Sequence, residues 1–415
     1  MIKIAILGLG NRGRGYGNLL LRHKNVEINA VCEKKEVLLQ QIGNKWNIED
    51  RYRFNNDETF FNAGKISDAL LICTQDKDHY KHAKRALELG YNILLEKPIS
   101  PDIKLCEQLS RLADERGLKV VVCHVLRYAP FYNAIKNVID NGDIGDVLHI
   151  NHTENVGYWH FAHSFVRGNW RSEEETSPDI LAKCSHDFDI IYWFTGKKCV
   201  EMQAYGGLRY FKKENEPVGA TNYCLNGCKA RKNCPFDVEK IYYGFTKYTT
   251  PFMIGNKTLI CGNNQATMKE FKEVLKTSPY GRCVYRCDND VFDSQTILMK
   301  LEGNVTATLS MQALTKRCYR KIHIYGTKGE IYGNDCDAKF TLNRFGGKCE
   351  VVHAKTGGMG HLGGDNGLID EFIKVLNGDN VSKKITYLKD SLESHKNALM
   401  SHKKMIETIK GKKDE

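Results

Sequence analysis

The chain opens with Met1-Ile-Lys-Ile-Ala-Ile-Leu-Gly8-Leu-Gly10-Asn-Arg-Gly13, and this stretch decides the fold. An apolar run of strand length ends at Gly8, and the three glycines form the pattern G-x-G-x-x-G directly before an expected helix over 14–22. In such a turn the first glycine permits the bend, the second lets the backbone approach a pyrophosphate, and the third lets helix and strand pack closely. The helix N-terminus would then face the phosphates. The pattern predicts a dinucleotide site that includes Asn11 and Arg12.

An acidic residue supports this reading and favours one cofactor. The next strand is expected over 27–32, and it ends at Glu33, twenty residues beyond Gly13. A carboxylate there can accept hydrogen bonds from the ribose hydroxyls and repels the 2′-phosphate of NADP, so we expect NAD. Lys34 and Lys35 follow directly and could compensate, which leaves NADP as the less favoured cofactor.

Further strands and helices alternate downstream. We expect buried strands over 68–74, 91–95 and 118–123, with helices over 79–89 and 101–116 between them. This alternation predicts a parallel sheet covered on both faces, with ligands at the carboxyl ends of its strands. Thr74 and His79 lie at one such end and are expected to line the cofactor, and Glu96-Lys97-Pro98 follows another strand.

Composition narrows the function classes. The chain has 415 residues, which is enough for two domains, and 61 Lys and Arg residues against 50 Asp and Glu. The basic residues are scattered, so we expect no nucleic-acid partner. No apolar run approaches the ~20 residues of a membrane helix, so we expect no membrane partner. Fifteen cysteines and no signal peptide favour reduced thiols and a cytoplasmic location.

Three motifs together resemble one known family. With Gly8-x-Gly10-x-x-Gly13, Glu96-Lys97-Pro98 and His186-x-x-Asp189, the chain resembles the glucose–fructose oxidoreductase/inositol dehydrogenase (Gfo/Idh/MocA) family along essentially its whole length. The resemblance implies an N-terminal Rossmann domain and a C-terminal α/β domain with a large open sheet. It also implies NAD(P)-dependent oxidation or reduction of a sugar or cyclitol, with the lysine of Glu96-Lys97-Pro98 beside the nicotinamide.

The second half of the sequence supports two domains. Strand patterns follow one another without intervening helices, which suggests an antiparallel or mixed sheet. They cover residues 146–154, 200–206, 296–301, 305–311 and 321–325, and closing helices are expected over 368–376 and 388–409. We therefore expect a Rossmann domain over 1–123 and a substrate-binding and oligomerisation domain over 124–415, with a Cys-containing insertion near 208–290. An open sheet needs covering, so a homodimer or homotetramer is expected.

His186 is the candidate proton-transferring residue. A helix is expected over 180–194, with one buried stripe and a second, partly apolar face that carries His186 and Asp189 and looks into a cleft. A histidine there can have a pKa near neutrality and take the hydroxyl proton as hydride leaves the same carbon, although a lone helical histidine can also be structural. Lys97 would hydrogen-bond the substrate oxygen.

The chain departs from the family pattern next to this histidine. Enzymes of the inositol dehydrogenase type commonly have an Asp four residues before the His, where this sequence has Ala182. Their Asp–His pairing therefore cannot be transferred. Lys183 could instead place a cation near the reacting oxygen and lower the proton affinity of His186.

Substrate contacts are expected from three segments. Arg127 and Tyr128 match the first cleft segment of the family. Residues 154–171 are polar and aromatic, as sugar-binding segments are, although the same composition suits a loop packed by its own aromatic rings. The candidates in that segment are Trp159, His160, His163, Arg167, Trp170 and Arg171. A glycine-rich loop over 357–365 adds His361.

The insertion carries a possible structural zinc site. Cys224, Cys228 and Cys234 could bind the metal with a fourth ligand from Cys261, Cys283 or Cys287. Reduced cysteines packed as small hydrophobic residues are an equally good interpretation.

The leading hypothesis is an NAD-dependent oxidoreductase acting on the CH–OH group of a sugar, sugar acid or cyclitol. The alternative is an NAD-dependent glycosidase, because some proteins of this fold keep NAD bound, oxidise a hydroxyl transiently, eliminate the aglycone, add water and return the hydride. The turn Gly10-Asn-Arg-Gly13 resembles the turn of such enzymes. A third hypothesis is a non-catalytic, NAD(H)-responsive binding protein.

Overall fold

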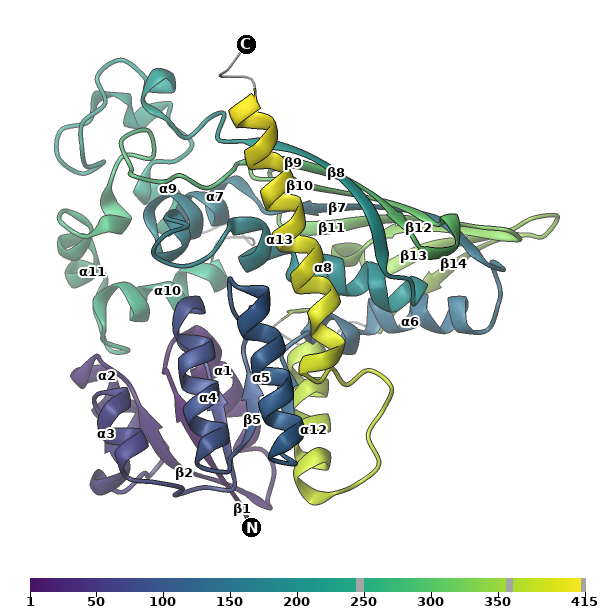
Figure 1. Cartoon of the computed structure of the whole chain (residues 1–415). Coiled ribbons are helices and arrows are strands. Elements are labelled where there is room, and N and C mark those ends of the chain that lie inside the picture. The colour runs from purple at the N-terminus through teal and green to yellow at the C-terminus, as the bar shows by residue number, and fades with distance from the viewer. Residues whose placement is uncertain (244–249, 356–360, 412–415) are drawn as a thin grey trace.

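The computed structural model describes residues 1–243, 250–355 and 361–411, and it has two β-sheets. Figure 1 shows the N-terminal sheet and its helices below, and the larger sheet extending above them. Within the described ranges, no helix is both long and apolar enough to cross a membrane.

The first sheet has six parallel strands in the order β3-β2-β1-β4-β5-β6. The strands are β1 (Ile2–Leu7), β2 (Val26–Cys32), β3 (Arg53–Phe54), β4 (Ala69–Ile72), β5 (Asn92–Leu95) and β6 (Val120–Val122). The strand order reverses between β1 and β4, and in such sheets the crevice for a ligand lies at the carboxyl ends of these two strands. The predicted Rossmann-type domain is confirmed.

Helices cover both faces of this sheet. Ile4 and Ile6 of β1 pack into one apolar cluster, and Ala5 and Leu7 pack into the other. The first cluster includes α1 (Asn11–Leu20), α2 (Glu36–Lys45) and α12 (Gly364–Asn377), and the second includes α3 (Asp57–Asn62), α4 (His79–Glu88) and α5 (Ile103–Glu115). The C-terminal segment therefore returns to complete the core of the N-terminal sheet.

The second sheet has eight strands in the order β14-β13-β12-β11-β7-β10-β9-β8. They are β7 (Val147–Asn155), β8 (Cys199–Gly207), β9 (Ser294–Leu301), β10 (Thr306–Gln312), β11 (Tyr319–Gly326), β12 (Gly329–Asn334), β13 (Lys339–Arg344) and β14 (Cys349–His353). Only β7 and β10 pair in parallel, so the predicted open, mostly antiparallel sheet is confirmed.

Three helices pack on one face of the second sheet, and one of them also reaches the first. These helices are α6 (Pro130–Asp140), α8 (Asp179–Thr195) and α13 (Leu388–Gly411). The long helix α13 contacts α8 and β8 and also α5, so it spans both parts of the molecule (Figure 1). The N-terminal half of α13 lies close to the carboxyl end of β5, where His395 contacts the backbone of Ile99.

The Cys-containing segment lies between β8 and β9. It contains the helices α9 (Val238–Tyr242), α10 (Thr250–Cys261) and α11 (Met268–Leu275), which sequence patterns did not predict. The predicted loop after β7 instead forms α7 (Tyr158–Phe161) and a π-helical turn over Ala162–Arg167. Short 3-10 turns cover Asp50–Tyr52, Asp76–Asp78, Val125–Tyr128, Asn169–Arg171, Lys213–Asn215, Lys229–Lys232, Pro279–Gly281, Glu302–Asn304, Asp335–Asp337 and His361–Gly363.

Candidate active site

The glycine turn between β1 and α1 fits a dinucleotide. Gly8 has a φ of +95°, and a Cβ on Gly13 would lie 2.0 Å from the carbonyl oxygen of Gly8. A Cβ on Gly10 would meet no described atom within 4 Å, so the space beside it is open. Gly10 is the N-cap residue of α1, and none of the described side chains caps the helix there. The first N–H groups of α1 are thus available to phosphates.

Glu33 lies beside this turn, at the end of β2. Its Oε2 accepts a hydrogen bond from the backbone N–H of Leu9 at 2.9 Å, and its Oε1 accepts one from that of Lys35 at 3.0 Å. These two bonds fix the carboxylate where the ribose of an adenosine would lie. The residues present therefore fit NAD.

Arg12 of the turn joins the two halves of the chain. Its Nε donates to Oε1 of Glu96 at 2.7 Å, and its two terminal nitrogens donate to both carboxylate oxygens of Asp365 at 2.9 and 3.0 Å. Nδ1 of His361 lies 3.0 Å from Oδ1 of Asp365. Arg12 thus ties the end of β5 to the start of α12, and Asp365 is the acidic residue at the end of the glycine-rich loop expected to complete the pocket.

Lys97 follows β5 and reaches the second part of the molecule. Its Nζ donates a hydrogen bond to the carbonyl oxygen of Ala182 on α8. Burial lowers the pKa of Lys97, while Glu96 and Asp76 oppose that shift. A lysine with a lowered pKa can share a proton with a substrate oxygen more readily than an exposed lysine can.

Two buried histidines, His79 and His395, hold the backbone that directly follows Lys97. The ring nitrogens of His79 lie 2.6 and 3.0 Å from the carbonyl oxygens of Pro98 and Thr74, so this side chain holds the loop to the end of β4. Nε2 of His395, on α13, accepts a hydrogen bond from the backbone N–H of Ile99 at 2.8 Å. Both residues position Lys97. Thr74 itself bonds to His82 at 3.0 Å.

His186 lies on α8, one turn beyond the carbonyl group that Lys97 contacts. The side chain is buried, and its Nδ1 has no hydrogen-bond partner among the described residues. Burial, and then the charge of Lys97, lower the pKa of His186 well below its usual value. The surroundings thus hold the pKa of His186 below the near-neutral value expected from the sequence, mainly through burial, and the cation that adds to this shift is Lys97 rather than Lys183. His186 is a neutral imidazole at neutral pH.

Asp189 is paired with protein rather than facing a ligand. Both of its oxygens accept hydrogen bonds from Arg127, at 2.8 and 2.7 Å, in a buried bidentate pair. His124 packs between this pair and His186, with its ring centroid 5.9 Å from that of His186. Tyr128 is buried in the apolar cluster that contains α12. Arg127 and Asp189 thus support His186 through His124, and Tyr128 packs in the core.

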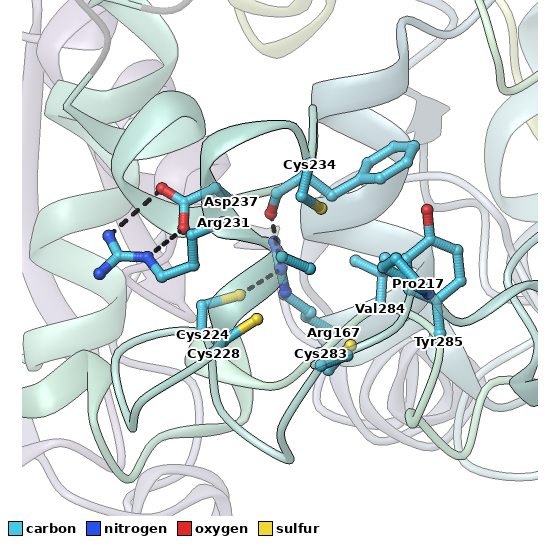
Figure 2. Close-up of a pocket in the computed structure, with 13 residues that line it drawn as sticks. Arg167, Pro217, Cys224, Cys228, Arg231, Cys234, Asp237, Cys283, Val284 and Tyr285 are labelled. Atoms are coloured by element: carbon cyan, nitrogen blue, oxygen red, sulfur yellow. Dashed lines mark hydrogen bonds and ion pairs between the residues drawn. The ribbon is translucent and has the colours of Figure 1, made fainter.

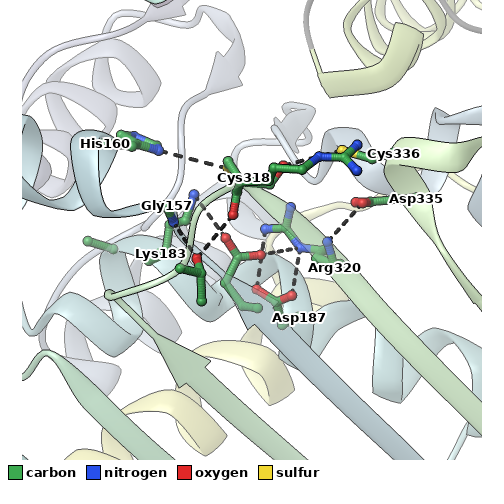
Figure 3. Close-up of polar contacts among 12 residues, drawn as sticks. Gly157, His160, Lys183, Asp187, Cys318, Arg320, Asp335 and Cys336 are labelled. Carbon is green, nitrogen blue, oxygen red and sulfur yellow. Dashed lines mark hydrogen bonds and ion pairs between the residues drawn. The ribbon is translucent and has the colours of Figure 1, made fainter. Parts of the chain in front are cut away.

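Lys183 belongs to a buried charged network between α8 and the second sheet, shown in Figure 3. Its Nζ lies 3.1 Å from Oε1 of Glu154 on β7, and Arg320 on β11 bridges Glu154 and Asp187 at 2.8 and 2.7 Å. Burial lowers the pKa of Lys183, but pairing with Glu154 outweighs this effect and raises that pKa above its usual value. Lys183 therefore remains a cation, and it fixes α8 against the sheet.

Two residues of the aromatic segment lie near these groups. The rings of Trp159 and His160 stack with centroids 5.8 Å apart. Nδ1 of His160 lies 4.0 Å from the sulfur of Cys318, next to the Lys183 network (Figure 3). Burial, and then Lys183, lower the pKa of His160 well below its usual value. These two residues remain candidates for substrate contact.

The other four residues of that segment bind protein groups. Nδ1 of His163 lies 2.7 Å from the hydroxyl of Tyr242, and Nε1 of Trp170 donates to Asp76 at 3.1 Å. Arg171 donates to Asp288 at 3.1 Å, and Nε of Arg167 donates to the carbonyl oxygen of Arg282 at 2.7 Å. Protein groups therefore hold these four side chains, and substrate contact by them stays a prediction. Apart from Glu175, which also pairs with Arg171, the partners named here are distant in sequence.

Two family models match the chain. The oxidoreductase-family model for the NAD-binding Rossmann fold matches residues 2–124, and the model for the C-terminal alpha/beta domain matches residues 136–353. The chain belongs to the Gfo/Idh/MocA family of oxidoreductases. The predicted family and the NAD-binding Rossmann fold are thereby confirmed.

Individual members of the Gfo/Idh/MocA family are distant. The chain is 24% identical over 314 residues to the oxidoreductase YteT of Bacillus subtilis (strain 168), covering 74% of this chain and 67% of YteT. It is 26% identical over 216 residues to an inositol 2-dehydrogenase/D-chiro-inositol 3-dehydrogenase of Lactiplantibacillus plantarum, covering 49% of this chain and 55% of that enzyme. The chain thus spans about half to two thirds of these relatives.

Solved structures confirm the fold over nearly the full length. The scyllo-inositol dehydrogenase of Lactobacillus casei, with bound NAD(H) and scyllo-inositol, superposes with a TM-score of 0.67 at 19% identity over 98% of both chains. An oxidoreductase of Agrobacterium radiobacter in complex with NAD+, L-tartaric acid and magnesium has a TM-score of 0.67 at 15% identity, covering 98% of this chain and 96% of that one.

The cysteines of the insertion surround an arginine. Cys224, Cys228, Cys234 and Cys283 line one pocket, and the buried guanidinium of Arg167 enters it (Figure 2). A terminal nitrogen of Arg167 lies 3.5 Å from the sulfur of Cys224 and donates to the carbonyl oxygen of Phe236 at 2.8 Å. Among the described residues, no group of three or more Cys, His, Asp or Glu side chains could hold a metal ion. The predicted zinc site is therefore not supported, because a fixed positive charge occupies its surroundings.

Proposed function

We propose that the protein is an NAD-dependent oxidoreductase that acts on a hydroxyl or carbonyl group of a sugar, a sugar acid or a cyclitol. One observation carries the proposal. The Lys97 ammonium, at the carboxyl end of β5, donates to the Ala182 carbonyl one turn before His186 on α8. An ammonium and a neutral imidazole from different parts of the chain therefore meet beside the glycine turn.

This pair of groups suits hydroxyl chemistry. The neutral His186 can accept the hydroxyl proton during oxidation, and the Lys97 ammonium stabilises the negative charge that develops on the oxygen. When bound, NAD supplies the acceptor for the hydride of the same carbon. Trp159 offers an apolar ring face and His160 a polar edge to a polyol. The inositol dehydrogenases among the relatives support this substrate class.

The proposed preference for NAD rests on two side chains. Glu33 is held by Leu9 and Lys35 at the position where it would repel a 2′-phosphate. Lys35, which could have attracted that phosphate, donates its Nζ to the carbonyl oxygen of Leu259 at 2.5 Å. The compensation considered from the sequence is therefore not favoured at Lys35.

A substrate screen tests this function directly. Purified protein is incubated with sugars, sugar acids and cyclitols in the presence of NAD or NADP, and the absorbance of the reduced nicotinamide is followed. We expect turnover of at least one of these compounds, with NAD as the better cofactor. NAD binding without turnover of any compound would favour the non-catalytic hypothesis and contradict the proposal.

A second candidate function is the NAD-dependent glycosidase, and a cover over the nucleotide site favours it. Residues 256–264 of the insertion, here called the cover segment, form hydrogen bonds to two parts of the N-terminal domain, the glycine turn and α2. Nδ2 of Asn11 donates to Oδ1 of Asn256 at 3.1 Å. Nε2 of Gln41 donates to Oδ1 of Asn263 at 2.8 Å, and the backbone N–H of Asn264 donates to Oε1 of Gln41 at 3.0 Å.

This cover suits an enzyme that keeps its cofactor. Because the cover segment is bonded both to the glycine turn and to α2, we expect it to slow the exchange of NAD. A simple dehydrogenase needs that exchange in each cycle, whereas a glycosidase of this type does not. Aryl glycosides belong in the screen for this reason. Their cleavage without accumulation of NADH, by protein that retains NAD on gel filtration, would select the glycosidase.

Removing the cover contacts is expected to speed NAD release. Gln41→Ala removes two hydrogen bonds to the cover segment, each worth about 1 kcal/mol, so we expect roughly thirtyfold faster dissociation of NADH. The rate is measured by stopped-flow fluorescence during displacement with excess NAD. Gln40→Ala is the control, because Gln40 bonds to Glu36 and Arg53 instead. Equal rates in the two variants would contradict a covering role.

We also propose that the protein forms a homodimer or homotetramer through the uncovered face of the second sheet. One continuous row crosses all eight strands on that face. In strand order from β8 to β14 it contains Gln203, Leu298, Thr308, Asn151, His323, Tyr332, Thr341 and Val351. Three large apolar side chains of this otherwise polar row, Leu298, Tyr332 and Val351, are exposed, and exposed apolar side chains on an open sheet favour an interface there.

A charge at the centre of this face is expected to separate the subunits. In Leu298→Lys an ammonium would have to be buried in the interface, so light scattering should show a shift toward the mass of one chain. Val218→Lys is the control, since Val218 is fully exposed in the insertion and lies outside the sheet. An unchanged mass for Leu298→Lys would place the interface elsewhere.

The fifteen cysteines, which suit a reducing compartment, support the cytoplasm as the proposed location.

A further inference from the structure

A second imidazole faces the candidate active site from the C-terminal part of the chain. The ring centroid of His361 lies 5.8 Å from that of His186. About a third of the His361 side chain is exposed, and its Nε2 has no hydrogen-bond partner among the described residues. The ring therefore offers one free nitrogen at a position that also affects His186, whose pKa is lowered by burial, Lys97 and His361.

The other nitrogen of His361 is fixed by an ion pair. Nδ1 lies 3.0 Å from Oδ1 of Asp365, and Arg12 donates to both oxygens of that carboxylate. Burial raises the pKa of Asp365, but the contacts with His361 and Arg12 outweigh this effect and lower that pKa below its usual value. The carboxylate therefore stays ionised. An ionised carboxylate at this distance orients an imidazole with Nδ1 as donor and Nε2 as acceptor. The Arg12 terminal nitrogen, 3.2 Å from Nδ1, limits how basic the ring becomes.

The backbone adopts an unusual conformation to place this ring. His361 and Leu362 have φ values of +40° and +57°, and Gly363 follows at +90°. Left-handed conformations cost roughly 1–3 kcal/mol for residues with a side chain, and they persist where other contacts enforce them. Here the bond to Asp365, at the start of α12, provides that enforcement. Residues 357–360, the rest of the glycine-rich loop singled out from the sequence, lie outside the described residues.

We propose that His361 is a second proton-transferring residue of the active site, and that Asp365 and Arg12 position it. This inference rests on the proposed function and deepens it. Oxidation of a hydroxyl requires one proton acceptor, which His186 provides. Once the hydroxyl has been oxidised to a carbonyl, Nε2 of His361 can take the proton from the adjacent carbon, and the C–H electron pair forms an enolate whose oxygen is held by Lys97. When the carbonyl forms again, a double bond forms between the deprotonated carbon and the carbon beyond it, and a leaving group departs from that second carbon with its bonding pair. The arrangement therefore suits substrates with a leaving group on the second carbon from the carbonyl.

Histidine titration tests the arrangement without any substrate. The NMR signals of ¹⁵N-labelled imidazoles are followed against pH in NAD-loaded wild-type protein and in Asp365→Asn. Loss of the carboxylate removes the charge that raises the proton affinity of His361, so we expect its pKa to fall and its tautomer preference to weaken. The signal of the exposed His353 on β14 should not move. An identical titration of His361 in both proteins would overturn the positioning role.

Kinetics of His361→Gln then test the chemical role. With a compound from the screen that carries such a leaving group, an aryl glycoside for example, we expect kcat to fall at least tenfold and its acid limb to change, while KM and the Kd for NAD stay within about threefold. His353→Gln is the matched control. An unchanged kcat would overturn the role of His361 and leave the proposed function intact. A screen without turnover would instead contradict the proposed function itself.

Discussion

Replacement of His186 by Ala is expected to lower turnover by about 10²–10⁴-fold, the usual range for loss of a positioned proton acceptor. The side chain is buried next to Lys97, and both effects keep the imidazole neutral. Asp189, on the same helix, cannot take over as the acceptor, because both of its carboxylate oxygens are paired with Arg127. The rate is measured with the compound found in the substrate screen.

The affinity for NAD separates chemistry from folding in this variant. We expect the Kd for NAD to stay within about threefold, because the glycine turn and Glu33 lie on other elements. His186→Asn, which fills more of the space, is the second variant and should show the same loss. His353→Ala, at an exposed position on the edge strand β14, is the control. Wild-type turnover in His186→Asn would contradict the proposed role of His186.

Lys97→Met should cause a similar loss for a different reason. The variant keeps the length of the side chain but removes the ammonium that stabilises the developing charge. Because Lys97 and His186 act on the same oxygen, we expect the double variant to lose little more than either single one. Fully multiplicative losses would indicate that the two groups act in separate steps.

The second large effect is expected from Ala at Gly13. A Cβ there would lie 2.0 Å from the carbonyl oxygen of Gly8, a backbone atom at the end of β1 that cannot move without disturbing the strand. We expect Gly13→Ala to lower the free energy of unfolding by about 3 kcal/mol, at the upper end for overpacking. Urea unfolding measures this loss.

Two neighbouring glycines provide controls that separate stability from binding. A Cβ on Gly10 or on Gly15 would meet no described atom within 4 Å. Gly10→Ala should leave the unfolding free energy unchanged but weaken NAD, because the methyl group enters the space of the pyrophosphate. Gly15→Ala, within α1, should leave NAD affinity unchanged and gain up to about 1 kcal/mol of stability. Equal NAD affinity in all three variants would place the cofactor elsewhere.

The fold was predictable where local pattern and packing agree. The apolar run before Gly8 and the acid at position 33 are read from neighbouring residues, and the structure places both as predicted. The return of α12 to the first sheet was not predictable, since its apolar stripe suits either sheet. The helices of the insertion were also missed, because its cysteines and basic residues mask their short apolar stripes.

The site was predictable only in part, for a similar reason. Motifs indicated Lys97 and His186, and the glycine-rich loop indicated His361 and Asp365, but His124 and His395 carry no local signal and gain their positions from partners far along the chain. The same limit explains the zinc prediction. Cysteine spacing indicated a metal, and nothing nearby indicated that Arg167 enters the same pocket. Charge partners across the fold decide such sites, and spacing alone cannot supply them.

The return of α12 to the first sheet limits how the protein can be dissected. A fragment that stops at residue 123 would lose Leu368, Ile369 and Phe372, which are fully buried against that sheet. The exposed apolar surface would make such a fragment sticky and prone to aggregation. A minimal cofactor-binding unit would therefore have to join the first 123 residues to 364–377 through an engineered linker.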